Sequence, residues 1–259
     1  MAMNYTEDKR AFHIKLFPGD VGRYCILTGD PGRCSSIAEH FDDPVQLSSN
    51  REFTVIAGSL CGERVSVCST GIGGPSAAIA MEEMFSCGAD TFIRIGTCGG
   101  ISKSVVPGES VVATAAVRQE GTSGEYAPPE YPAAADFGVT CALVQAARES
   151  GILCRAGVVQ SKDSFYGQHD PSRMPVSAAL AEKWEVWKRL GVLASEMECA
   201  ALFTVAASLG VRCGAILHVI WNQERFAAGF SDTESQDTSP TVGCAVDALR
   251  VLIESDREL

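Results

Sequence analysis

The chain has 259 residues, of which 46% are hydrophobic and 20% charged, and its formal net charge is −11. This composition is typical of a soluble globular protein with a substantial core, and the lack of any Lys and Arg block disfavours nucleic acid or an anionic membrane as a partner. No apolar run reaches the roughly 20 residues that cross a bilayer, and the polar N-terminal segment does not resemble a secretory signal.

One α/β domain is expected over residues 1–259, because no linker rich in Pro, Gly or Ser divides the chain. The 11 cysteines are scattered, several of them in apolar runs, and no C-x-x-C pair occurs. This pattern indicates small buried side chains in a reducing cytoplasm rather than disulfides. The four histidines lack metal-ligand spacing, so a zinc site is not expected.

Strand-like and helix-like segments alternate along the chain. Apolar runs predict strands at 24–30, 53–60, 63–69, 90–96, 109–117, 152–161 and 212–221. Helical patterns, several closed by glycine, cover 31–41, 75–88, 139–151, 176–191, 195–210 and 241–256. Cys61 and Gly62 predict a hairpin turn between two of the strands. Interleaved apolar strands and helices predict a largely parallel sheet covered on both faces.

Arg94 stands out, because "TFIRIG" places a permanent cation inside an apolar strand, where an unpaired charge is costly. Two interpretations stay open: an ion pair with an internal acid, or a guanidinium fork held ready for phosphate. Thr97 beside glycine amides would also suit an anion. Gly29 followed by Arg33 at a helix start has the same character. We expect such loops to meet at the carboxyl ends of the strands.

The stretch "SEME" at 195–198 carries two acids where an apolar helix is predicted to begin. In one interpretation Ser195 is the N-cap and Glu198 completes a capping box. In the other, the helix N-terminus keeps Glu198 ionised, so that it accepts hydrogen bonds from vicinal hydroxyls while Met197 packs on a sugar face. Both interpretations stay open on the sequence alone.

Six motifs follow one another in order: "GDPGR", "NREF", "STGIGGPS", "RIGTCGG", "DSFY" and "SEME". Together they give the chain a resemblance to the nucleoside phosphorylase-I family, from about His13 to the last helix, and most closely to its uridine-cleaving members. The resemblance implies an α/β, three-layer αβα fold with a mostly parallel, mixed central sheet. It also implies a homo-hexamer built as a trimer of dimers.

By the same resemblance, the activity is reversible phosphorolysis of uridine to uracil and ribose 1-phosphate, with inorganic phosphate as co-substrate and no cofactor. The implied catalytic residues are Arg94, Glu198 and Gln168. Phosphate would be bound by Gly29, Arg33, Arg94, Thr97 and, from a neighbouring subunit, Arg51. Ribose would contact Thr97, Met197, Glu198 and the neighbour's His13. The base would stack near Phe165 and bond to Gln168. A monovalent cation such as potassium would sit at the dimer interface on Glu52, Ile72 and Ser76.

Two positions depart from the family pattern. Asp170 stands where related proteins often carry a base-reading arginine, so the missing cation is expected from Arg173 or His169. Asn222 stands where purine-cleaving relatives use aspartate, which favours a pyrimidine, and the bulky Trp221 would narrow the base pocket. The preference among uridine, deoxyuridine and thymidine stays open. The rival functions are a purine nucleoside phosphorylase, a nucleosidase that cleaves with water, and a nucleoside-binding protein without turnover.

Overall fold

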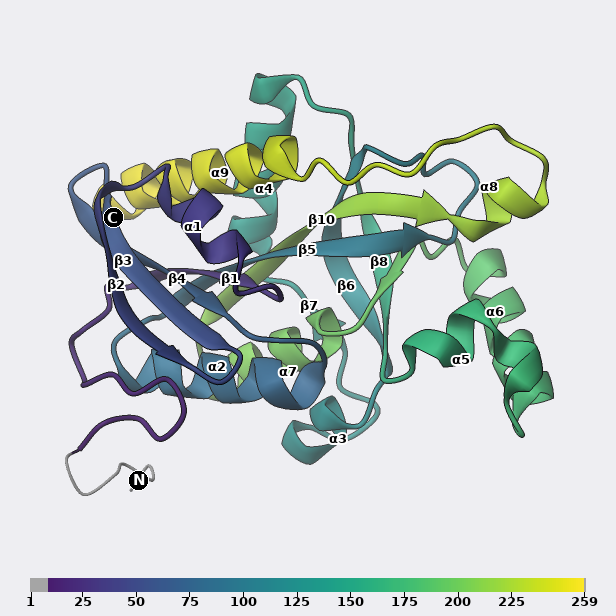
Figure 1. The fold of residues 1–259 in the computed structure, drawn as a ribbon, viewed down its shortest axis with the longest axis horizontal. Helices are drawn as coiled ribbons and strands as arrows, with labels where there is room; N and C mark the ends of the chain where they lie inside the picture. Colours follow the sequence, from purple (N-terminus) through teal and green to yellow (C-terminus); the bar gives the residue numbers. More distant parts are fainter. Residues whose placement is uncertain (1–8, 259) are drawn as a thin grey trace.

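The structure is a computed structural model in which residues 9–258 are described (Figure 1). The strands are β1 (Tyr24–Thr28), β2 (Asp42–Asn50), β3 (Phe53–Leu60), β4 (Glu63–Ser69), β5 (Thr91–Gly100), β6 (Ser110–Gln119), β7 (Ala133–Ala134), β8 (Cys154–Lys162), β9 (Ala194–Glu196) and β10 (Arg212–Asn222). The helices are α1 (Arg33–Ala38), α2 (Gly74–Ser86), α3 (Thr122–Tyr126), α4 (Phe137–Ser150), α5 (Phe165–His169), α6 (Ser177–Arg189), α7 (Cys199–Leu209), α8 (Gln223–Ala227) and α9 (Ser239–Arg257), with a 3-10 turn η1 (Pro171–Arg173).

All these strands belong to one mixed sheet that helices cover on both faces, in agreement with the three-layer fold that the resemblance implies. Figure 1 shows α1, α4 and α9 on one side of the sheet, and α2, α3 and α7 on the other. Parallel pairings join β4, β1, β5 and β10 in that order, and also β6, β8 and β9. Antiparallel pairings join β10 to β6 and β9 to β5. The five strands β5, β10, β6, β8 and β9 therefore close into a ring.

The central strands β1 and β5 are largely apolar because both of their faces are buried. In β1, Cys25 and Leu27 pack in one hydrophobic cluster, whereas Tyr24 and Ile26 pack in the other, on the opposite face of the sheet. The cysteines follow the same logic: all are free, and most are buried, with Cys141 the exposed exception. The predicted role of cysteine as a small buried side chain is therefore confirmed for most positions.

Most of the predicted strands and helices are present, and the hairpin turn is confirmed by positive φ angles of 52° at Cys61 and 78° at Gly62. Three strands among residues 9–258 were not predicted: β7 and β9, which have only 2 and 3 residues, and the edge strand β2, which is mostly exposed and polar. Within residues 9–258, no helix combines the length and apolar character that crossing a membrane requires.

The helix expected to begin at Ser195 begins instead at Cys199, so the capping box is wrong. Residues 194–196 form the short strand β9, and Ser195 pairs with Gly99 of β5 and with Gln160 of β8. Ser195 is therefore held in an extended conformation by two neighbouring strands that lie far from it in the sequence. A local capping pattern cannot compete with hydrogen bonds to strands on both sides.

Candidate active site

A cavity of about 910 Å³ opens where β1, β5, β8 and β10 end and where β9 passes into α7. This is the edge of the sheet where loops and helix N-termini gather in open α/β folds. The predicted site residues that line the cavity are Gly29, Arg33, Ile72, Arg94, Thr97, Phe165, Met197 and Glu198. The fold therefore brings together residues from positions 29 to 198 of the chain.

Arg94 and Glu198 form a buried ion pair, with only 3% and 4% of the two residues exposed. The Nη2 atom of Arg94 donates a hydrogen bond to Oε2 of Glu198, and Oε1 of Glu198 accepts one from the Gly73 amide at 2.6 Å. Gly73 can present its amide there because it has a φ angle of 98°, which favours glycine. An internal acid therefore does meet Arg94.

The pair does not use all of the hydrogen-bonding capacity of Arg94. Its Nε and Nη1 atoms are buried and have no hydrogen-bond partner among residues 9–258, although Nε lies 3.8 Å from Oε2 of Glu196. Such unsatisfied buried donors are rare, and each calls for an explanation, which a bound ion or a catalytic role can provide. Gly96 leaves room for this fork, because a Cβ atom there would lie 3.2 Å from Nη2 of Arg94.

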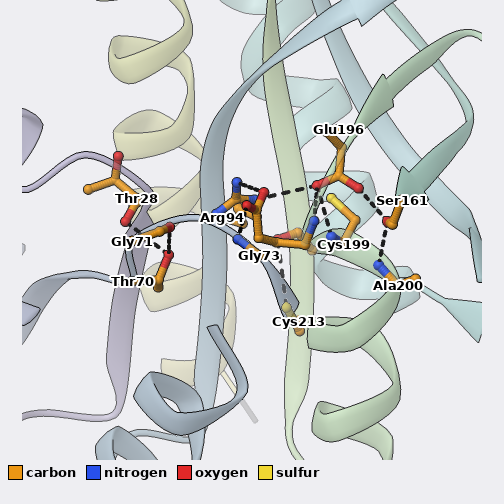
Figure 2. A network of polar contacts seen from close by, with 12 residues as sticks. Thr28, Thr70, Gly71, Gly73, Arg94, Ser161, Glu196, Cys199, Ala200 and Cys213 are labelled. Carbon is orange, nitrogen blue, oxygen red and sulfur yellow. Dashed lines mark hydrogen bonds and ion pairs between the residues drawn. The ribbon is translucent and has the colours of Figure 1, made fainter. Parts of the chain in front are cut away.

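The two acids of "SEME" have different partners. Glu196, rather than Glu198, receives the helix amides: its Oε2 accepts from the backbone of Glu198 at 2.7 Å and of Cys199 at 2.9 Å. Its other oxygen accepts from the Ser161 hydroxyl, which in turn accepts from the Ala200 amide at 2.8 Å (Figure 2). Glu196 and Ser161 thus cap α7 from the neighbouring strands β9 and β8.

The expectation that the helix N-terminus keeps Glu198 ionised is therefore wrong. Burial raises the pKa of Glu198, and the Arg94 guanidinium opposes that rise. Because Glu198 precedes the helix and bonds to Arg94 and Gly73, its ionisation depends on Arg94. Each carboxylate oxygen has more than one acceptor site, so Glu198 can keep its bond to Arg94 and still accept hydrogen bonds from the hydroxyls of a ligand.

Lys162 lines the same cavity and was missed by the sequence analysis. It is the last residue of β8, and a lysine in "QSKDS" is typical of a solvated strand end. Only 5% of the residue is nevertheless exposed. Its ammonium donates a hydrogen bond to Oγ of Ser195 at 2.7 Å. Burial lowers the pKa of Lys162 from 10.5 to about 8, against the opposing effect of Glu196 and Glu198.

The residues predicted to read the base lie around α5. Phe165 and His169 line the main cavity, and Gln168 lines an adjoining hollow of about 520 Å³. Oγ of Ser195 lies 2.6 Å from Oε1 of both Gln168 and Gln160, and its single proton can be donated to either of them. Lys162 and His169 line both hollows, so the two spaces meet at these side chains.

Two positions singled out in the sequence lie outside the main cavity. Arg173 sits on the exposed turn η1, where its Nε lies 3.1 Å from Oδ2 of Asp170. The Asn222 side chain is buried in its own loop: its Nδ2 donates to the carbonyls of Ser102 and Val105, both at 2.8 Å. Its oxygen caps α8. Asn222 therefore has a structural role, whereas its neighbour Trp221 lines the cavity.

A second group of predicted residues lies away from the cavity, near the tip of the β2–β3 hairpin. Arg51 occupies the turn, with a φ angle of 54°, and is exposed. The adjacent Asn50 donates from its side chain to the His13 carbonyl at 2.7 Å. The His13 ring in turn lies 2.7 Å from a carboxylate oxygen of Glu83. Arg51 and His13 therefore share one region of the surface.

The predicted cation ligands lie beside this region. The Ser76 hydroxyl is 2.8 Å from Oε1 of Glu52, and hydrogen bonds lower the pKa of that carboxyl. Ile72 is 76% exposed in the loop that follows β4. No group of three or more His, Cys, Asp and Glu side chains in residues 9–258 is arranged to hold a metal ion.

Comparison with known proteins agrees with this geometry. The sequence model of the phosphorylase superfamily matches residues 23–249. The chain is 50% identical to the uridine phosphorylase of Treponema pallidum over 256 residues, which are 99% of both chains. It is 42% identical to the uridine phosphorylase of Escherichia coli, over 93% of this chain and 98% of that one. It is also 40% identical to the guanosine phosphorylase of Halorubrum lacusprofundi, over 81% and 83% of the two chains.

Proposed function

The chain belongs to the phosphorylase superfamily, and on this basis we propose that it is a pentosyltransferase that cleaves uridine with phosphate, reversibly, to uracil and ribose 1-phosphate. The observation that carries the proposal is the Arg94 fork, buried beside Glu198 in a large cavity with two nitrogens that lack a partner. The uridine phosphorylases at 50% and 42% identity support the pyrimidine substrate.

In this proposal Arg94 and Arg33 bind inorganic phosphate, together with the backbone of Gly29 and the hydroxyl of Thr97. All four residues line the cavity, which supports their grouping. The acceptors that Nε and Nη1 of Arg94 lack would be supplied by phosphate oxygens, in strong charge-assisted hydrogen bonds. Phosphate fixed in this way would face the anomeric carbon of a nucleoside bound beside it.

Glu198 and Met197 would then bind the ribose. Arg94 keeps Glu198 ionised, the remaining acceptor sites of the carboxylate bond to the vicinal hydroxyls, and the half-buried Met197 packs on the sugar. Bond breaking builds positive charge on the ribose and negative charge on the base. The site would stabilise this separated state more than the ground state, with phosphate below the sugar. Phe165 and Gln168 would bind the base.

The function is tested by following base release with and without phosphate. We expect uracil from uridine only when phosphate is present, and we expect Arg94→Met to abolish saturation by phosphate. Deoxyuridine and thymidine belong in the same panel, and so do inosine and guanosine, because one relative is a guanosine phosphorylase. Faster cleavage of the purine nucleosides, release without phosphate, or binding without release would each favour one of the three rival functions instead.

We also propose that the active protein is a cytoplasmic homo-hexamer, a trimer of dimers, in which Arg51 and His13 complete a neighbour's site. Their shared position outside the cavity supports this, since neither residue lines it. Potassium at the dimer interface would be bound near Glu52, Ile72 and Ser76. Mixing inactive Arg51→Ala and Arg94→Ala chains tests the arrangement. Mixed oligomers should regain activity, because some sites would then hold both arginines; no recovery after verified subunit exchange would contradict it.

A further inference from the structure

Lys162 is a buried cation that the phosphate and ribose sites do not use. Its ammonium carries three donors, and its one hydrogen bond to the rest of the described chain goes to the neutral hydroxyl of Ser195. A buried lysine is costly unless its charge is used. The charge of Lys162 is not needed to hold β8 in the sheet, because β8 pairs with β6 through backbone hydrogen bonds. The position therefore points to a ligand.

The ligand is identified by the neighbours of Lys162. The Ser195 hydroxyl bonds to the Lys162 ammonium at 2.7 Å and to Oε1 of Gln168 at 2.6 Å, so the amide and the cation lie side by side. Lys162 also precedes the segment that carries Phe165, which lines the same cavity. An aromatic ring, an amide and a cation together suit a planar heterocycle with carbonyl oxygens.

Other cations near this end of the cavity are less suitable. Arg173 is exposed and is paired with Asp170. His169 lines both hollows, but burial and the nearby Lys162 lower its pKa, so that the ring is neutral at pH 7. Lys162 is buried, lines the cavity, and holds its positive charge near neutral pH. Lys162, at the end of β8, can therefore supply the positive charge that related proteins often obtain from an arginine at the position of Asp170.

We propose, on the premise that the chain cleaves uridine, that the Lys162 ammonium bonds to a carbonyl oxygen of the pyrimidine and stabilises its negative charge as the glycosidic bond breaks. In this step a phosphate oxygen bonds to C1′ and the C1′–N1 bond breaks. The bonding pair moves onto N1 and is delocalised over O2 and O4. Lys162 keeps its proton throughout. The proton of the monohydrogen phosphate leaves the new phosphoester and neutralises the base.

The test compares two leaving groups in the intact protein. Lys162→Met should lower kcat/KM for uridine by about 10²–10³-fold, the usual effect of losing one donor to a developing anion. The loss should be about tenfold smaller for 5-fluorouridine, because fluorine already stabilises the departing base. Apparent affinity for phosphate should not change. Lys103→Met is the matched control, because this lysine is exposed and does not line the cavity.

A merely structural role gives a different result. If Lys162 only holds Ser195 and Gln168 in place, Lys162→Met should lower kcat/KM equally for both nucleosides, and Ser195→Ala should do the same. This result would overturn the proposal. Direct binding of uracil, measured by titration calorimetry, separates the proposal from the function on which it rests. Uracil should bind the wild type and bind Lys162→Met at least about tenfold more weakly. Equal binding to both proteins would refute the role of Lys162 even if turnover fails, whereas no binding to the wild type would refute the proposed function.

Discussion

Replacing Arg94 by methionine should destabilise the protein strongly, because it leaves the carboxylate of Glu198 buried without its counter-charge. Breaking a buried pair in this way costs about 3–5 kcal/mol, which is a large part of the roughly 5–15 kcal/mol that stabilises a typical domain. We expect the cost for this pair to lie near the upper limit of that range. Both residues are at most 4% exposed, and the Glu196 carboxylate adds a second negative charge 3.8 Å from Nε of Arg94.

A double-mutant cycle measures this coupling. Glu198→Gln keeps an oxygen for the Gly73 amide but removes the charge, so the double variant with Arg94→Met should regain at least about 2 kcal/mol relative to additivity. The assay is urea unfolding at one protein concentration. Arg250→Met is the control, because its 3.7 Å pair with Asp247 is exposed and should be worth less than about 1 kcal/mol.

Phosphate provides an independent readout of the same side chain. At about one hundred times its dissociation constant, phosphate should stabilise the wild type by about 2.7 kcal/mol and should leave Arg94→Met unchanged. The reasoning would be refuted by additive effects in the cycle, or by equal phosphate stabilisation in the wild type and the variant. Additive effects would mean that Arg94 and Glu198 are not energetically coupled, and equal phosphate stabilisation would mean that Arg94 does not bind phosphate.

Two further predictions concern buried polar side chains. The lowered pKa of Lys162 means that between pH 8 and 10.5 the unfolded chain holds a proton that the folded chain has lost, so stability should rise with pH in this window. The unfolding free energy of the wild type minus that of Lys162→Met should increase by about 3 kcal/mol across it, and a flat difference would contradict the burial of the charge. Asn222→Asp should cost about 1–3 kcal/mol without conferring purine cleavage, because it removes both donors to Ser102 and Val105. Thermal unfolding and inosine turnover would check this, and a gain in inosine turnover would contradict it.

Much of the fold follows from local patterns in the sequence. Apolar runs predict strands because both faces of the sheet are covered, so every side chain of a central strand is buried. Cys25 and Ile26, for example, are buried on opposite faces of β1. The edge strand β2 escaped prediction because its mostly exposed, polar residues carry no such signal. Arg94 was also identified from the sequence, since a cation in an apolar strand demands a partner.

The sequence by itself determined that Arg94 must meet an anionic group, and that the acids of "SEME" lie near a helix start. Only the tertiary structure decided which acid has which role: Glu198 pairs with Arg94, while Glu196 caps α7. It also decided that the lysine at the end of β8 is buried in the cavity. The physical reason is the distance along the chain over which each feature is decided. Local periodicity determines which face of a strand or helix a residue occupies. The position of β9 between β5 and β8 depends instead on pairings with residues about 35 to 100 positions away.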